Sequence, residues 1–265
     1  MHFDTLPGNA ESALFPLTGG QSDIWIAHVL DPASDGLVIC ASVEFFGPID
    51  IGRLEKAIRQ TVTENDGQHL NFVNTDNGPR QYFRSFDDFD LPKIDFTSED
   101  NPRAAAMAWM HADRAKPFDF ENGPLFRYAL IKTATDGFFL YCINHHLIAD
   151  WFASMLFFRR IGEIYGALAF GTAPPPSTLL SFRELVDEDI AYHRSRQFVR
   201  DRDYWCAQLA SRPDVVTLSG RPPHGRGSSR KSGAIVPARV VERLGRLGAA
   251  HGAGLAAVIM AAAAI

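Results

Sequence analysis

The sequence predicts an α/β fold, because strand-like runs alternate along it with segments of helical periodicity. Residues 37–46 (LVICASVEFF) are rich in β-branched and aromatic side chains and end at a Gly-Pro pair, which is typical of a strand. Residues 51–62 place apolar side chains at helical spacing, behind Asp50 as a capping residue. Residues 138–143 (FFLYCI) are apolar throughout, as expected of a central strand buried on both faces.

The remaining elements follow in order. Residues 70–73 and 81–83 read as short extended runs around a turn at Asn77-Gly78-Pro79. An alanine-rich helix is expected over 102–116. The strand at 138–143 forms a hairpin with residues 125–132 through Asp136-Gly137.

Helices dominate after this hairpin. Residues 152–168 are expected to form a helix with one buried stripe, made of Met155, Phe158, Ile161 and Tyr165. Three prolines at 174–176 break the pattern, and one long helix or two follow over 182–210.

The domain organisation follows from composition. Residues 1–15 are expected to be a flexible N-terminus and 16–218 a first lobe, while the Gly/Pro/Ser-rich stretch 219–233 is interpreted as a loop or interlobe linker. Residues 234–265 would begin a second lobe, with a short strand at 234–236 and helices starting near Ala238 and Ala253. The chain stops within an apolar helix without a terminating signal, so we expect a continuation that buries it.

Composition excludes several classes of protein. The 265 residues carry a net charge of −5 with dispersed basic residues, which argues against nucleic-acid binding. The three cysteines form no metal or disulfide pattern. The N-terminus lacks the features of a signal peptide, and the longest apolar run, 255–265, is too short to span a bilayer. A cytoplasmic protein without membrane contact or bound metal is expected.

The strongest candidates for chemistry are His145, His146 and Asp150, which directly follow the apolar strand. A histidine at a strand exit combines rigidity with access to substrate and can act as a general base near neutral pH. Asp150 could orient a histidine or pair with an arginine. Equally, both histidines could be ordinary packed residues and Asp150 the N-cap of the next helix.

Several motifs in order resemble one family. The run His145–Asp150 (HHLIAD) resembles the HHxxxDG signature of nonribosomal peptide synthetase condensation domains, in the chloramphenicol-acetyltransferase-like superfamily. Thr18–Trp25 resembles the opening S/T-x-x-Q-x-x-x-W motif, and Glu64–Phe72 stands where the E-x-x-L-R-x-R-F motif is expected. Residues 117–127 (PFDFENGPLFR) and Asp201–Trp205 (DRDYW) resemble two further segments.

The resemblance implies a chloramphenicol-acetyltransferase-like sandwich, with a mixed β-sheet and flanking helices, truncated in the second lobe. It implies amide formation between a carrier-bound acyl or peptidyl thioester and a carrier-bound aminoacyl group, in a tunnel between the lobes. His146 would be the principal catalytic histidine, His145 mainly structural, and Asp150 would hold the loop through an ion pair. Ala149 and Trp151 would line the substrate tunnel.

The resemblance also implies partners. Donor and acceptor carrier-protein domains would deliver substrates on phosphopantetheine arms, beside a neighbouring adenylation domain, with no cofactor bound to this domain itself. Other readings stay open: an ester-forming or epimerisation domain, a free-standing O-acyltransferase, or a catalytically silent docking domain for carrier proteins.

The sequence departs from the family pattern at a few positions. Trp151 replaces the signature glycine, which leaves catalytic competence open, and His69 and Asn71 replace arginines, for which altered packing or polar pairing is expected. Trp25 and Trp205 are expected to be packing anchors. Arg127 is interpreted as a solvent-facing strand residue, or alternatively as a partner of the histidine motif.

Overall fold

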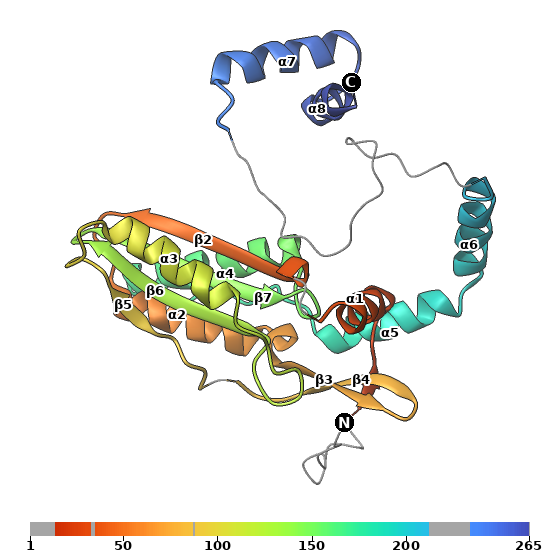
Figure 1. The fold of residues 1–265 in the computed structure, drawn as a ribbon, viewed down its shortest axis with the longest axis horizontal. Helices are drawn as coiled ribbons and strands as arrows, with labels where there is room; N and C mark the ends of the chain where they lie inside the picture. The colour runs from red at the N-terminus through yellow and green to blue at the C-terminus, as the bar shows by residue number, and fades with distance from the viewer. Residues whose placement is uncertain (1–13, 33–34, 87, 212–233, 265) are drawn as a thin grey trace. The chain divides into compact units, whose positions relative to one another are not determined.

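The computed structural model describes residues 14–32, 35–86, 88–211 and 234–264 (Figure 1). The chain divides into two compact units, Met1–Pro223 and His224–Ile265. The predicted linker and most of the predicted flexible N-terminus lie outside the described residues.

A four-stranded mixed sheet forms the centre of the larger unit. Its strand order is β2-β7-β6-β5, with β7 antiparallel to both neighbours and β5 parallel to β6. The predicted central strand is confirmed, since β7 pairs on both edges and all of its residues are buried. The strands are β2 (Val38–Phe46), β5 (Lys93–Asp95), β6 (Phe126–Ala134) and β7 (Gly137–His145).

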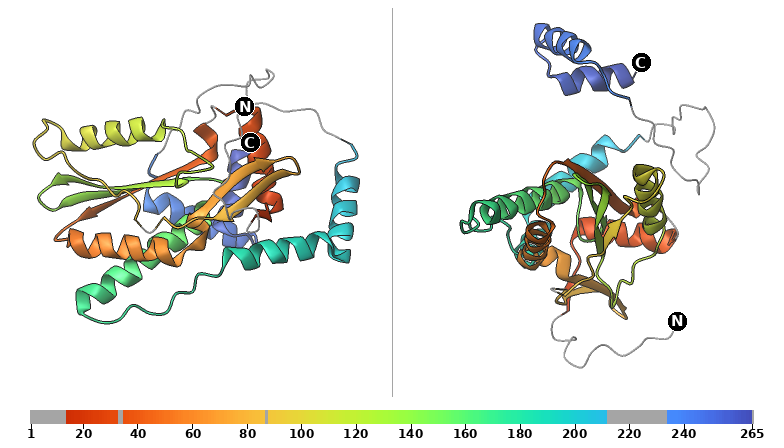
Figure 2. Two further views of the ribbon diagram at one scale, coloured as in Figure 1. Left: turned by 90° about the horizontal axis from the view of Figure 1, so that it is seen from below. Right: turned by 90° about the vertical axis from the view of Figure 1, so that its left-hand side faces the viewer.

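Helices cover both faces of this sheet (Figure 2). On one face α2 (Ile51–Glu64) and α4 (Trp151–Phe170) pack through residues such as Ile58 and Ile161 onto Leu140 and other strand residues. On the opposite face α3 (Pro102–Arg114) packs against neighbouring positions of the same strands. Because successive strand side chains point to opposite faces, the continuously apolar β7 serves both cores.

Smaller elements complete the larger unit. A second sheet has the order β1-β4-β3, with β1 (Phe15–Pro16), β3 (Leu70–Thr75) and β4 (Gly78–Phe83). The remaining helices are α1 (Gly19–Leu30), α5 (Phe182–His193), α6 (Arg196–Gln208) and the short 3-10 turns η2 (Asp35–Leu37) and η3 (Asp66–His69). The predicted segment 182–210 therefore forms two helices.

The boundaries of α2 and α4 follow from their capping residues. Asp50 accepts a hydrogen bond from the backbone N–H of Arg53 at 3.0 Å, as predicted for the start of α2. Asp150 caps α4 in the same way, and α4 ends at Gly171, whose φ of 68° suits a residue without a Cβ.

The predicted stripe of α4 is only partly correct. Ile161 is buried, but Met155 is 48% exposed, and Phe157 and Ile164 are buried in its place. The helix is apolar on most of its surface, so spacing alone did not single out one face.

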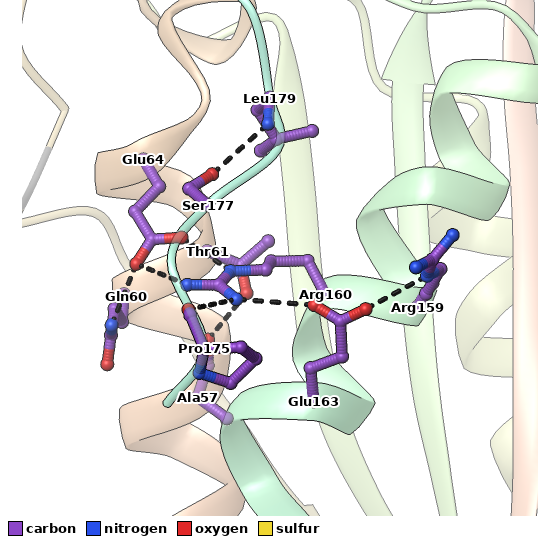
Figure 3. A network of polar contacts seen from close by, with 10 residues as sticks. All are labelled: Ala57, Gln60, Thr61, Glu64, Arg159, Arg160, Glu163, Pro175, Ser177 and Leu179. Atoms are coloured by element: carbon purple, nitrogen blue, oxygen red, sulfur yellow. Dashed lines mark hydrogen bonds and ion pairs between the residues drawn. The ribbon is translucent and has the colours of Figure 1, made fainter. Parts of the chain in front are cut away.

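A buried arginine joins α2 to α4 (Figure 3). Arg160 Nε and Nη2 donate to the two carboxylate oxygens of Glu64 at 2.6 and 3.0 Å, while Nη1 donates to Glu163 and to the carbonyl of Pro175. The hydrogen bond from Arg160 holds the pKa of Glu64 below its usual range. This network fixes the two helices and the proline-rich segment together.

The smaller unit contains α7 (Ala238–Ala250) and α8 (Leu255–Ala263). The predicted strand at 234–236 is wrong, since these residues have no regular structure; a strand of three residues needs a partner, and none is described in this unit. Within the described chain no single helix is long and apolar enough to cross a membrane, although α7 and α8 together, bent by 100°, reach that length and composition.

Replacing Arg160 is expected to destabilise the larger unit. The Arg160→Met variant should lose about 3–5 kcal/mol of unfolding free energy, because the Glu64 carboxylate keeps its partly buried position without its partner. Arg159→Met is the matched control: its ion pair with Glu163 is largely exposed and should contribute about 0–1 kcal/mol. Urea unfolding followed by circular dichroism measures both values, and equal losses would contradict the assignment.

Candidate active site

The two adjacent histidines lie where β7 ends. His145 is the last residue of the strand and only 3% exposed. His146 follows in the turn leading to α4 and is half-buried. The sheet therefore holds the first histidine rigidly and presents the second at the edge of the core.

Hydrogen bonds fix the backbone on both sides of His146. Its own N–H donates to the carbonyl of Leu37 at 2.9 Å, and the N–H of Ile148 donates to the carbonyl of His145 at 3.1 Å. The N–H of Leu147 donates to Nδ1 of His145 at 3.1 Å. Because Nδ1 accepts this bond, the neutral ring of His145 carries its proton on Nε2.

The ring of His145 packs among other rings. The centroid of Phe120 lies 4.9 Å from it, that of His28 5.9 Å and that of Phe118 6.0 Å. Burial, reinforced by the neighbouring His28 and His146, lowers the pKa of His145 to about 3. A histidine with such a low pKa holds a proton poorly near pH 7. The ring of His145 is therefore better suited to supporting the loop than to transferring protons.

A cavity of about 380 Å³ lies against this ring. Its aromatic walls include Phe118 and Phe120, and Arg114 and Lys116 contribute positive charge. The volume falls within the range of small-molecule sites. The full lining consists of His28, Pro32, Val38, residues 114–118, Phe120 and His145.

The imidazole of His146 is available for chemistry. Within the described chain no residue hydrogen-bonds this ring, while the backbone on both sides of it is held. A neutral imidazole in such a position can accept a proton or a hydrogen bond from a substrate.

Asp150 acts locally on α4. Its Oδ1 accepts a hydrogen bond from the N–H of Ala153 at 2.7 Å, which is the N-cap role considered for it from sequence. Among the described residues no ion pair involves Asp150, in contrast to the pairing that the family resemblance implied. Ala149 is half-buried against the core, and Trp151, the first residue of α4, is 60% exposed.

Comparison with known proteins decides the family. The condensation-domain family matches residues 11–265, which is nearly the whole chain. The chain belongs to the condensation-domain family.

Relatives of this condensation domain are peptide synthetases. It is 34% identical over 230 residues to the dimodular nonribosomal peptide synthase of Bacillus subtilis (strain 168), covering 87% of this chain and 10% of that protein. It is 34% identical over 222 residues to the isonitrile lipopeptide synthase of Streptomyces coeruleorubidus, covering 83% of this chain and 15% of that protein. The chain thus spans a small part of these relatives.

Solved structures confirm the predicted fold class. The first condensation domain of the calcium-dependent antibiotic synthetase, in complex with a substrate analogue, matches with a TM-score of 0.84 and 28% identity, covering 96% of this chain and 60% of that one. A point mutant of the starter condensation domain of rhizomide synthetase RzmA, in complex with C8-CoA, matches with a TM-score of 0.77 and 33% identity, covering 80% and 49%.

His69 and Asn71, which replace arginines of the family motif in the Glu64–Phe72 segment of this condensation domain, make polar contacts, as expected. Nδ1 of His69 accepts from the N–H of Phe86 at 3.0 Å, and its Nε2 lies 3.0 Å from the carbonyl of Val62. The amide of Asn71 donates to the carbonyls of Phe120 and Gly123 at 3.0 and 2.8 Å. Asn71 therefore holds the loop that carries one wall of the cavity.

Both interpretations of Arg127 were wrong. Its guanidinium donates to the buried carboxylate of Asp113 at 3.0 Å and lies 4.3 Å from the ring of Phe118, and the side chain is only 25% exposed. Trp25 packs against aromatic rings as predicted. The prediction for Trp205 was wrong: its side chain is 60% exposed, on a helix α6 that has no buried residue.

Sequence reasoning missed three residues around the histidines. Asp113 supports the loop at 116–118 through Arg127 and Lys116, and Gln21 and Gln81 form a buried amide pair beside Leu147. Gln21 could have been found, since it is the glutamine of the opening motif, whereas no local pattern marks Asp113 or Gln81. The described residues contain no cluster of potential metal ligands.

Titration of His145 should make stability depend on pH. Its folded pKa of about 3 lies below the ordinary value of 6.5, so neutral His145 stabilises the fold above pH 6.5, and this contribution is lost as the pH falls toward 3. His145→Asn keeps an acceptor for the N–H of Leu147 but does not titrate. Thermal unfolding between pH 7 and 4 should show a smaller loss for the variant than for the native chain, and parallel curves would contradict this.

Proposed function

We propose that this chain is the histidine-bearing part of a nonribosomal peptide synthetase condensation domain. The complete domain would join a carrier-bound acyl or peptidyl thioester to a carrier-bound aminoacyl group through an amide bond. The observation that carries the proposal is His146: its backbone is fixed on both sides at the end of a buried strand, and no hydrogen bond to its ring is found among the described residues. Membership of the condensation-domain family supports it.

The proposed reaction follows from the properties of imidazole. The amine nitrogen of the acceptor attacks the thioester carbonyl carbon, the C–N bond forms, and the C–S bond breaks as the thiol leaves with a proton. His146 would either take the proton of the attacking amine or hold the amine and stabilise the tetrahedral state. His145 and Asp150 would act on the loop and on the start of α4, through the contacts to Leu147 and Ala153.

The proposed partners are donor and acceptor carrier-protein domains and a neighbouring adenylation domain. Substrates would arrive on phosphopantetheine arms, without a cofactor held by this domain. The relatives support this setting, since they are peptide synthetases of which this chain matches a small part. A cytoplasmic location remains a prediction from the sequence.

The role of His146 can be tested by substitution. In the complete domain with two loaded carrier proteins, His146→Ala should lower the rate of amide formation by about 10²–10⁴-fold, the usual contribution of a general acid–base group. His111→Ala is the control, because His111 is exposed on α3. Product formation measured by mass spectrometry should fall in the first variant alone; equal rates would refute the proposed role.

A substitution at Trp151 tests whether this residue restricts catalysis, as the alternative of a catalytically silent docking domain would require. Its indole stands at the first position of α4, where the family signature has glycine. If it narrows access to His146, Trp151→Gly should raise the rate of amide formation. The control is Phe152→Gly, which removes the next exposed aromatic ring from the same helical turn. Unchanged product formation in Trp151→Gly would show that the indole does not restrict the reaction.

A further inference from the structure

A single glutamine near the start of α1 contacts three separate parts of the larger unit. Oε1 of Gln21 accepts the N–H of Thr18 at 3.0 Å, which completes a capping box at the start of α1. Its Nε2 donates to Oε1 of Gln81 on β4 at 2.9 Å and to the carbonyl of Leu147 at 3.0 Å. Leu147 is the residue directly after His146.

The partner glutamine completes the arrangement. Nε2 of Gln81 donates back to Oε1 of Gln21 at 2.8 Å and to the carbonyl of Pro16 at 2.9 Å. Gln21 is 5% exposed and Gln81 is 0% exposed. Every N–H of the two amides therefore has an acceptor, as a buried polar pair requires.

This glutamine pair provides a hydrogen-bond donor for a backbone carbonyl in the histidine loop, the residues that follow β7. Leu147 lies beyond the end of β7, where the strand ladder no longer pairs its polar groups. Side chains satisfy both of its backbone groups: Nδ1 of His145 accepts from its N–H, and Nε2 of Gln21 donates to its carbonyl. Leu147 is itself only 1% exposed, so its carbonyl has little access to water.

We propose that Gln21 is a positioning residue for His146. By holding the Leu147 carbonyl, it fixes the peptide unit between Leu147 and Ile148, one unit beyond the one that follows His146, and thereby restrains the backbone from which the imidazole projects. This inference rests on the proposed catalytic role of His146. Gln81 fixes Gln21 in turn, and among the described residues its side chain hydrogen-bonds Gln21 and the carbonyl of Pro16 and not the histidine loop.

A matched pair of variants separates positioning from stability. Gln21→Met and Gln81→Met each replace one buried amide of the pair by an apolar chain of similar length. Only Gln21→Met removes the bond to Leu147. Both should lower the melting temperature. In the complete domain with loaded carriers, Gln21→Met should lower kcat by about 10–100-fold with KM nearly unchanged, since a small misplacement of a reacting group costs that much.

The outcomes are distinct. Gln81→Met should retain kcat within about threefold of the native value, because Gln21 still reaches Leu147 and the reacting geometry is kept. An equal fall of kcat in both variants, or native kcat in Gln21→Met, would overturn the positioning role. His146→Ala is measured in parallel: if it remains fully active, the proposed function of His146 fails, whereas an inactive His146→Ala with an active Gln21→Met overturns the positioning role alone.

A second variant covers the case in which Gln21→Met does not fold. In Gln21→Glu the ionised carboxylate has no proton for the Leu147 carbonyl, but the protonated acid does, and burial raises the pKa of such a group. The kcat of Gln21→Glu relative to the native enzyme should therefore rise as the pH is lowered. A ratio that stays constant with pH would contradict the proposal.

Discussion

The structure depends on the burial of one strand on both faces and both edges. β7 pairs with β2 and β6 along its length, and every residue of it is buried. A strand held in this way cannot shift by one residue without turning all of its side chains to the wrong face. Its register with β2, in which Val38 lies opposite His145, therefore determines where the histidines leave the sheet.

The loop after β7 is stabilised mostly by residues far from it in the sequence. Gln21 and Leu37 contact its backbone, and Phe120 packs on the ring of His145. Asn71 in turn holds the carbonyl of Phe120. The segments around His146 are thus contributed by α1, the small sheet and the central sheet.

The departures from the family motifs are accommodated by local contacts. His69 and Asn71 stand where the family motif has arginines, and their side chains hydrogen-bond nearby backbone groups, as buried polar side chains require. Asp150, with no ion pair among the described residues, caps α4. His145 is likewise kept neutral by its surroundings. Its ring is buried against Phe118 and Phe120, and this burial lowers its pKa.

The amino-acid sequence by itself determined the α/β class, the central strand, the capped helix α2 and the family, because these depend on local patterns of apolar residues and on motif order. Tertiary structure decided the buried face of α4, the pairing of Arg127 with Asp113 and the contact between Gln21 and Leu147. The two contacts join residues that are far apart along the chain. The buried face of α4 is one of several apolar faces that its sequence allows. All three are set only when the sheet, the helices and the loops have packed together.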